Sequence, residues 1–240
     1  MKKKNLFLFV NIFLFTITVT LLVKENYVNR VLIKINKSKN IIDKKAYLNN
    51  WKYKQELDLY KSYQKKGDIV MLGNSITYRI NWNELLNRTD VINRGIGSDV
   101  TEGFISRLDY IIKVKPKMCF IMGGINDLQQ GIKSSTINSN IQTITKNLKT
   151  NNIESIVFSI LYVADSFLDS NNLNTKIKKT NELIEFNCNK NNIEFIDLNK
   201  KLENNGKLRS EYSFDGIHLT HLGYEKWGEI INSIINEKII

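Results

Sequence analysis

Histidine and cysteine are scarce in this chain, and each occurs only twice among its 240 residues. Cys119 lies in an apolar stretch and Cys188 in a helix-like one, so both are expected to be small buried hydrophobic residues, and they provide no disulfide framework. The two histidines are His218 and His221. A serine nucleophile needs a general base at neutral pH, usually a histidine. A serine–histidine mechanism therefore has only two places for its base here.

A serine follows the first buried strand expected in the sequence. Residues 68–72 are a short, mostly apolar run that ends in Gly73-Asn74-Ser75, which is typical of a buried strand followed by a turn. Ligands of open α/β sheets bind at the carboxyl edge of the strands, so this position suits a reactive hydroxyl. The alternative interpretation is that Ser75 caps the next helix. Thr77 stands where the α/β-hydrolase elbow requires glycine, which excludes that motif.

An acid and a histidine lie close together near the C-terminus, in Asp215-Gly216-Ile217-His218. The pair suits a histidine base with an orienting carboxylate, although Asp-Gly is also common in simple turns. His221 adds a third conceivable metal ligand, but zinc sites usually need more ligands and neither cysteine is nearby, so no metal is expected. We expect His221 to begin a final helix instead. The apolar stripe of that helix consists of Tyr224, Trp227, Ile230, Ile231 and Ile234.

Two further polar clusters follow short apolar stretches and are therefore expected at strand ends. They are Asn93-Arg94-Gly95-Ile96-Gly97-Ser98-Asp99 and Gly123-Gly124-Ile125-Asn126-Asp127. The first contains the start of a dinucleotide fingerprint, but Val100 occupies the position of the third glycine, and no nucleotide is implied. Taken alone, Asn126-Asp127 is also compatible with a simple turn, because Asn and Asp side chains bond to nearby backbone there.

Together, and in this order, the four blocks resemble those of the SGNH, or GDSL, hydrolase superfamily. The resemblance covers about residues 67–235 and is closest to bacterial GDSL-type esterases similar to platelet-activating factor acetylhydrolase. It implies that Ser75 is the nucleophile, His218 the general base and Asp215 the carboxylate that orients the imidazole. It also implies an oxyanion hole in which the Asn126 side chain and the Ser75 backbone N–H donate. Such a donor typically stabilises the transition state by about 2.7–4 kcal/mol, and no cofactor is required.

Two positions depart from the family pattern. Ser98 stands where a glycine usually supplies the remaining backbone donor of the oxyanion hole, and Gly97 lies one residue earlier. A backbone N–H does not require glycine, but Ser98 must then adopt the backbone angles that the loop needs. Asn74 replaces the aspartate of the family name. Because that aspartate is not the triad acid, we expect little loss of activity.

Apolar runs and helix-like segments alternate along the rest of the chain. Further strands are expected at 117–122, 155–160 and 194–198, with helices at 99–113, 135–149 and 174–189. This alternation predicts an α/β fold with a parallel sheet covered on both faces. The resemblance adds a three-layer, doubly wound, flavodoxin-like sheet of five strands, the SGNH hydrolase fold.

The N-terminus carries a long uncharged run. Residues 5–23 follow three lysines and, at about 1.5 Å per residue, form a helix just long enough to cross the hydrocarbon core of a membrane. We predict an uncleaved signal anchor, a transmembrane helix at 1–23, with a single-pass topology and the catalytic domain outside the cytoplasm. The alternative is secretion after signal cleavage, although no Ala-x-Ala site is present.

Positive charge is concentrated before the catalytic region. Residues 1–56 hold 12 Lys or Arg and 3 acids, whereas residues 57–240 hold 23 and 21. We expect a basic stalk at 24–66, ending in a helix that packs on the hydrolase domain at 67–240. An anionic lipid or cell-wall surface is its expected partner rather than nucleic acid, and a solvated stalk without a partner is the alternative. The candidate packing residues of the helix are Trp51, Leu57, Leu59, Tyr60 and Tyr63.

The leading hypothesis is a serine esterase that removes a short acyl group from a lipid or a surface carbohydrate, through an acyl-enzyme on Ser75. Two alternatives remain. A carbohydrate O-acyltransferase would pass the acyl group to a sugar instead of water. A noncatalytic surface-binding module would keep the fold with a defective oxyanion hole at Ser98.

Overall fold

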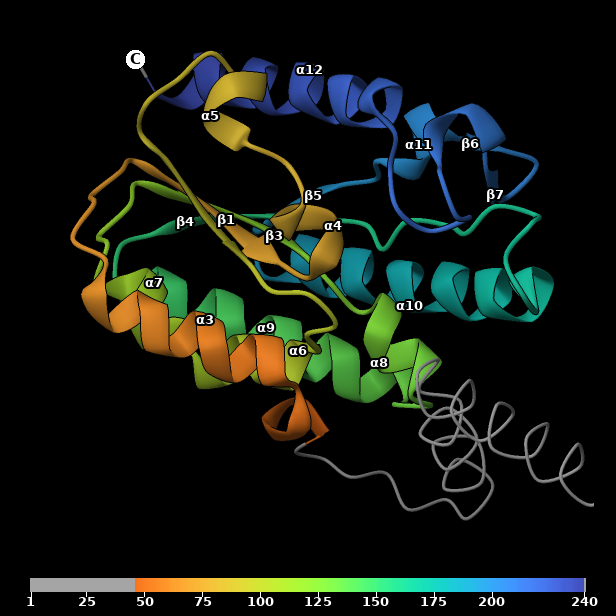
Figure 1. Ribbon diagram of the computed structural model, residues 1–240. Helices are drawn as coiled ribbons and strands as arrows, with labels where there is room; N and C mark the ends of the chain where they lie inside the picture. The colour runs from red at the N-terminus through yellow and green to blue at the C-terminus, as the bar shows by residue number, and fades with distance from the viewer. Residues whose placement is uncertain (1–45, 240) are drawn as a thin grey trace, which may run out of the picture. The chain divides into compact units, whose positions relative to one another are not determined.

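A five-stranded parallel sheet lies at the centre of the computed structural model, which describes residues 46–239 (Figure 1). Strand β1 pairs with β2 on one side and with β3 on the other. The direction in which strands are added to the sheet therefore reverses at β1. This confirms the predicted α/β fold and the flavodoxin-like order. In spatial order the strands are β2 (Val91–Gly95), β1 (Ile69–Gly73), β3 (Met118–Met122), β4 (Glu154–Phe158) and β5 (Glu194–Ile196).

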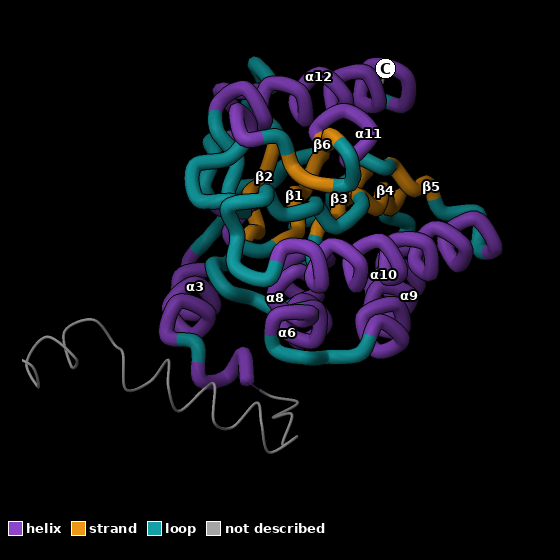
Figure 2. The backbone as a smooth tube through the Cα atoms, turned by 90° about the vertical axis from the view of Figure 1, so that its right-hand side faces the viewer, coloured by secondary structure: helices purple, strands orange, loops and turns teal. Residues whose placement is uncertain are grey.

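Helices cover both faces of this sheet (Figures 1 and 2). Alternate residues of β1 point to opposite layers: Val70 and Leu72 join the core under α6 to α10, whereas Ile69 and Met71 join the core under α5 and α12. Burial on both faces explains why the central strands read as continuous apolar runs. The helices are η1 (Ala46–Asn49), α3 (Trp51–Ser62), α4 (Ser75–Tyr78), α5 (Trp82–Leu85), α6 (Thr101–Ser106), α7 (Leu108–Ile112), α8 (Ile125–Gln129), α9 (Ser134–Thr150), α10 (Ser170–Lys190), α11 (Asn199–Leu202), η2 (Ser210–Tyr212) and α12 (His221–Lys238), and a small hairpin pairs β6 (Glu203–Asn204) with β7 (Lys207–Leu208).

Helix α12 begins at His221, as predicted, and packs through the predicted stripe. Trp227 is fully buried, with its ring centroid 4.8 Å from that of Trp82 in an edge-to-face arrangement, a favourable geometry for aromatic pairs. The Tyr224 hydroxyl donates to the Ile76 carbonyl at 2.7 Å. Helix α12 therefore supports the turn that carries Ser75.

Helix α3 packs on the domain, as predicted, but through a partly different set of side chains. Tyr53 and Tyr60 are buried and Leu57 is partly buried, a spacing that places all three on one helix face. Trp51 and Leu59 are exposed, so their predicted packing role was wrong, whereas the ring centroid of Tyr63, although its side chain is partly accessible, lies 5.7 Å from that of Tyr60. The burial of Tyr53 is explained by its hydroxyl, which reaches into the domain and donates to the Gly103 carbonyl at 3.1 Å.

The single helix predicted at 99–113 is two helices, α6 and α7, which meet at Arg107 (φ −121°, ψ 15°). The break accompanies the burial of the Arg107 side chain, which points toward the sheet rather than to solvent. The helices predicted at 135–149 and 174–189 are confirmed as α9 and α10. The last predicted strand is shorter than expected and ends at Ile196, because Leu198 N–H bonds to the Ser159 hydroxyl instead of a neighbouring strand.

The predicted membrane anchor and most of the basic stalk lie outside the described residues. Among residues 46–239, no helix has the length and apolar character needed to cross a membrane. Helix α3 belongs to the same compact unit, Lys44–Ile240, as the sheet. The division of the chain at residues 23 and 66 stays a prediction.

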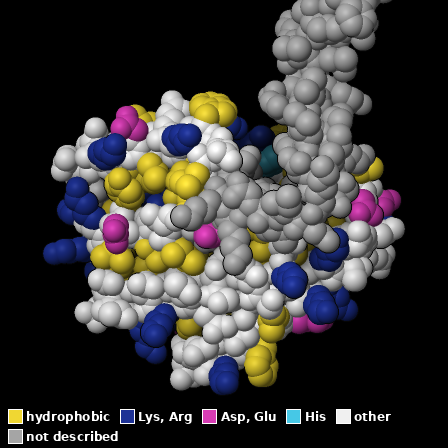
Figure 3. Space-filling model, turned by 90° about the horizontal axis from the view of Figure 1, so that it is seen from below, with side chains coloured by type: hydrophobic (Ala, Val, Ile, Leu, Met, Phe, Trp, Pro, Cys, Tyr) yellow, Lys and Arg dark blue, Asp and Glu magenta, His cyan; other side chains and the backbone are white. Residues whose placement is uncertain are grey.

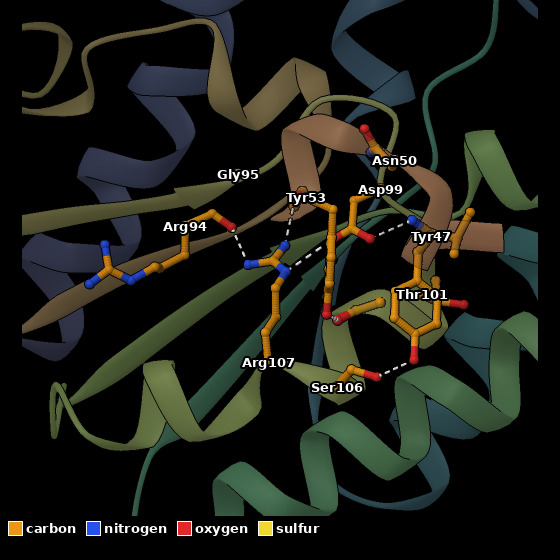
Figure 4. Close-up of polar contacts among 12 residues, drawn as sticks. Tyr47, Asn50, Tyr53, Arg94, Gly95, Asp99, Thr101, Ser106 and Arg107 are labelled. Atoms are coloured by element: carbon orange, nitrogen blue, oxygen red, sulfur yellow. Dashed lines mark hydrogen bonds and ion pairs between the residues drawn. The ribbon is translucent and has the colours of Figure 1, made fainter. Parts of the chain in front are cut away.

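Arg107 joins the ends of two strands to the loop that follows them (Figure 4). Its guanidinium is completely buried, and Nε donates to the Asp99 carboxylate at 2.9 Å. Nη1 donates to the Arg94 carbonyl of β2 at 2.7 Å, and Nη2 to the Gly73 carbonyl of β1 at 3.0 Å. The three acceptors compensate for the loss of hydration that burying the cation entails.

Replacing Arg107 with methionine should lower the free energy of unfolding by about 3–5 kcal/mol, because Asp99 is left as a buried, unpaired carboxylate. Urea-induced unfolding of the full chain measures this change. Lys226→Met is the matched control, since it removes an exposed ion pair with Glu229 and should cost less than about 1 kcal/mol. Equal effects of the two substitutions would contradict the role given to Arg107.

Candidate active site

Ser75 lies in a tight turn between β1 and α4. Asn74 caps the helix, with its side-chain oxygen accepting from Ile76 N–H at 3.0 Å, and Ser75 is the first helical residue. The capping role that was the alternative for Ser75 therefore belongs to Asn74. Gly73 is packed so tightly that a Cβ atom there would collide with Thr77 and with the Met122 carbonyl at 2.8 Å. The absence of a side chain at Gly73 lets β1 turn sharply at this point.

The structure brings Ser75, His218 and Asp215 together, although Ser75 and His218 are 143 residues apart in sequence. Ser75 Oγ lies 2.9 Å from His218 Nε2, and His218 Nδ1 lies 2.6 Å from Asp215 Oδ2. An ionised carboxylate only accepts hydrogen bonds, so the imidazole proton belongs on Nδ1. Nε2 is then free to accept the proton of the Ser75 hydroxyl.

The Asp215 carboxylate is fixed by the backbone of its own loop. Its Oδ1 accepts from His218 N–H at 2.8 Å and from Ile217 N–H at 3.1 Å, and Gly216 makes this turn with a φ of +87°. Partial burial raises the pKa of Asp215, but the hydrogen bonds from His218 and Ile217 outweigh it, and the pKa lies below its usual value. The carboxylate is therefore ionised at neutral pH.

The loops after β1, β2 and β3 leave the sheet at the same level, because Gly73 pairs with Gly95 on one side and with Met122 on the other. The loop after β2 turns at Ser98, whose φ is +62°. This is the left-handed region that favours glycine, so Ser98 holds a backbone conformation that glycine adopts more readily. Gly97 precedes it and is buried.

Asn126 connects the loop after β3 to the loop after β2. It lies in the first turn of α8, and its Nδ2 donates to the Asp99 carbonyl at 2.8 Å. An amide nitrogen carries two hydrogens, so one remains for another acceptor. Within residues 46–239, the backbone N–H groups of Ser75 and Ser98 also have no acceptor.

Several residues that support these loops were not assigned a role from the sequence. Asp127 is fully buried and accepts from both the backbone N–H and the hydroxyl of Thr101, the first residue of α6. Asn50 donates to the Gly97 carbonyl at 2.7 Å and also caps α3. An Asn directly before a helix is a recognisable capping signal, but its reach to Gly97 is a tertiary contact that no local pattern contains.

A small apolar cavity lies beside the Ser75 turn. The lining includes Asn74 and Ile76, which flank Ser75 in sequence, and side chains from the ends of β3 and β4. Its remaining lining residues are Met122, Gly123, Ile125, Ile160 and Leu161.

The cysteines and His221 lie outside this constellation. Cys119 and Cys188 are buried and free, as predicted, and burial raises the pKa of both thiols to about 12, which makes them poor nucleophiles. Residues 46–239 contain no group of three or more His, Cys, Asp or Glu side chains placed to hold a metal ion.

Two known proteins match a large part of this chain in sequence. Platelet-activating factor acetylhydrolase IB subunit alpha2 of Homo sapiens is 26% identical over 182 residues, which cover 71% of this chain and 77% of that protein. N-acylneuraminate cytidylyltransferase of Streptococcus agalactiae serotype III is 26% identical over 158 residues, 66% of this chain, and the match spans only 36% of that longer protein.

Solved structures share the fold. A GDSL-like lipase from Bacteroides thetaiotaomicron superposes with a TM-score of 0.69 at 24% identity, covering 78% of this chain and 98% of that one. A lipase/acylhydrolase from Enterococcus faecalis gives a TM-score of 0.61 at 25% identity, covering 72% and 96%. The model of the GDSL-like lipase/acylhydrolase family matches residues 71–226, which include all the polar residues described above from Ser75 to His218. The chain therefore belongs to the GDSL-like lipase/acylhydrolase family.

Proposed function

We propose that this protein is a serine esterase that forms an acyl-enzyme on Ser75. The observation that carries the proposal is the continuous chain of hydrogen bonds from Ser75 Oγ through His218 to Asp215. A half-buried hydroxyl in contact with an imidazole, whose other nitrogen faces an ionised carboxylate, is the arrangement that nucleophilic serine chemistry needs.

In the proposed mechanism, Ser75 Oγ attacks the acyl carbon while His218 Nε2 takes the hydroxyl proton. His218 returns this proton to the oxygen of the departing alcohol as the carbon–oxygen bond of the ester breaks. The imidazole then removes a proton from water, which attacks the acyl carbon, and returns this proton to Ser75 Oγ as the bond between Oγ and the acyl carbon breaks and the carboxylic acid leaves. Asp215 stays ionised throughout and stabilises the imidazolium that forms in each half-reaction.

The oxyanion of each tetrahedral intermediate is proposed to bind to three N–H groups: the backbone N–H of Ser75 and Ser98 and the free amide hydrogen of Asn126. Support comes from the lack of other acceptors for the backbone groups within residues 46–239 and from the fixed position of the Asn126 amide on Asp99. Donors fixed before the reaction stabilise developing charge without reorganisation. The left-handed conformation of Ser98 weakens the binding-module alternative, which depended on a defective loop.

The proposed substrate is an ester of a short acyl group with a lipid or a surface carbohydrate. The small apolar cavity next to Ser75 favours a short acyl chain, because residues at the end of β3 and in the loop after β4 line it and leave little room. The names of the matched relatives concern acyl groups: one is an acetylhydrolase, and the other acts on an N-acylated sugar acid.

Replacing Ser75 with alanine should reduce kcat/KM for p-nitrophenyl acetate by about ten-thousand-fold or more, because the nucleophile is lost. A fluorophosphonate probe should label the native protein and not the variant. Ser139→Ala is the control, since Ser139 is exposed on α9. Retained hydrolysis or labelling in the Ser75 variant would overturn the proposal.

Replacing Asn126 with alanine should lower kcat by about 100- to 1,000-fold with little change in KM, because the lost donor acts on the transition state. Steady-state kinetics with p-nitrophenyl acetate separate the two constants. A change confined to KM would instead assign Asn126 to substrate binding.

Two substitutions at Ser98 should have opposite effects, because the side chain is exposed and only the backbone conformation is at issue. Glycine should keep the activity and raise the free energy of unfolding by up to about 1 kcal/mol. Valine, which disfavours positive φ, should lower kcat by about 5- to 30-fold. Equal activities of the two variants would remove Ser98 from the proposed oxyanion hole.

A further inference from the structure

Arg94 is a buried cation without a carboxylate partner in the part of the chain that the structure describes. Its residue is only 6% exposed, and none of the ion pairs within residues 46–239 includes it. Nη1 donates to the Asn93 carbonyl at 3.2 Å, and the buried Nε has no acceptor among residues 46–239. Figure 4 shows the side chain extending away from the guanidinium of Arg107. Burying an unpaired charge is costly, so this arrangement calls for an acceptor.

Two tyrosines at the C-terminal end of helix α3 stack on this guanidinium. Its carbon lies 4.4 Å from the ring centroid of Tyr60 and 5.5 Å from that of Tyr63. Such contacts stabilise the cation through its face and supply no acceptor for the N–H groups at its edge. The hydroxyl of Tyr60 is buried and also without a partner within residues 46–239. Burial raises the pKa of Tyr60 to about 12, so this hydroxyl keeps its proton and can donate it.

These groups line one pocket, between the end of α3, the segment before β1, and α7. We call it the Arg94 pocket; Lys65, Lys66 and Lys113 complete its basic lining, and none of the described residues that line it is acidic. The lysines are exposed, and Lys66 bridges the two sides by donating to the Lys113 carbonyl at 2.9 Å. On the face of the molecule that carries α3 and α7, Lys and Arg side chains lie interspersed with hydrophobic ones (Figure 3). None of the residues of the proposed catalytic triad lines this pocket.

Glu56 is the one carboxylate of α3 whose charge reaches Arg94, and it does not occupy the pocket. Glu56 is not among the residues that line the pocket, and no ion pair within residues 46–239 joins it to Arg94. Burial lowers the pKa of Arg94, with Tyr60 opposing the effect, and Glu56 is the smallest of the named influences. The demand for an acceptor at Nε is therefore not met by Glu56.

We propose that the Arg94 pocket binds a phosphate group, either as free phosphate or as the phosphomonoester of a larger molecule. The residues that line it carry a guanidinium, a buried phenol hydroxyl and three ammonium groups, and all of these groups can donate. Phosphate has several acceptor oxygens and up to two negative charges, which match such a set better than the two oxygens of a carboxylate. The partly buried position shields the contact from screening by salt.

Isothermal titration calorimetry of the full chain with inorganic phosphate and with glycerol 3-phosphate tests the proposal. Arg94→Gln should weaken binding of the preferred ligand by about ten-fold or more. Arg209→Gln is the matched control: Arg209 also stacks on a tyrosine, Tyr212, but is exposed and already paired with Glu211. It should leave the affinity unchanged. Tighter binding of glycerol 3-phosphate would identify an esterified headgroup as the ligand, and tighter binding of inorganic phosphate would identify the free anion.

A second variant keeps the test valid if Arg94→Gln does not fold. Lys113→Met removes an exposed side chain and should weaken binding by about two- to five-fold, whereas Lys226→Met, on α12, should have no effect. Absence of binding to the native chain would overturn the proposal. Equal weakening by the Arg94 and Arg209 variants would also overturn it, because the interaction would then be a general effect of surface charge.

Discussion

The buried ion pair of Arg107 and Asp99 is the contact on which the arrangement of the site depends. Through three hydrogen bonds the guanidinium fixes the end of β1, the end of β2 and the loop that follows β2. The backbone carbonyl of Asp99 in turn receives the amide of Asn126. The positions of the turn at Ser75 and of two proposed oxyanion donors therefore depend on the side chain of Arg107. A buried pair contributes little net stability, but it strongly disfavours any other relative position of the groups that satisfy it.

Helix α3 supports the same loop from outside the region that the family model matches, which begins at residue 71. Asn50 bonds to the Gly97 carbonyl, next to Ser98, and Tyr53 bonds to the Gly103 carbonyl in α6. Ser98 holds a backbone conformation that costs a non-glycine residue about 1–2 kcal/mol. Contacts that fix the preceding carbonyl help to meet this cost. A segment before the family region is therefore part of the apparatus that shapes the proposed oxyanion hole.

Features that depend on local pattern could be predicted from the sequence, and features that depend on tertiary partners could not. The apolar runs of β1 and β3 and the long helices α9, α10 and α12 carry their own periodicity. The scarcity of histidine and the family resemblance together pointed to Ser75, His218 and Asp215. The break between α6 and α7 at Arg107 has no local sequence signal, because it accompanies hydrogen bonds from the Arg107 side chain to three acceptors that lie outside these helices. The sequence prediction placed Trp51 on the buried face of α3 because tryptophan is more hydrophobic than tyrosine. In the structure Tyr53 is buried instead, and its hydroxyl donates to a backbone carbonyl of the domain.

A comparison of three arginines distinguishes cations whose charge is paired within the fold from a cation whose charge is not. Arg107 is buried and paired with Asp99, so its position is explained by the fold. Arg209 is exposed and paired with Glu211, where solvent screens the charge and little depends on it. Arg94 shares the burial of the first and the tyrosine stacking of the second but lacks the carboxylate that both possess among the described residues. The fold holds the Arg94 side chain in place, but the described residues supply no acceptor for its Nε. A bound anion supplies the missing acceptor.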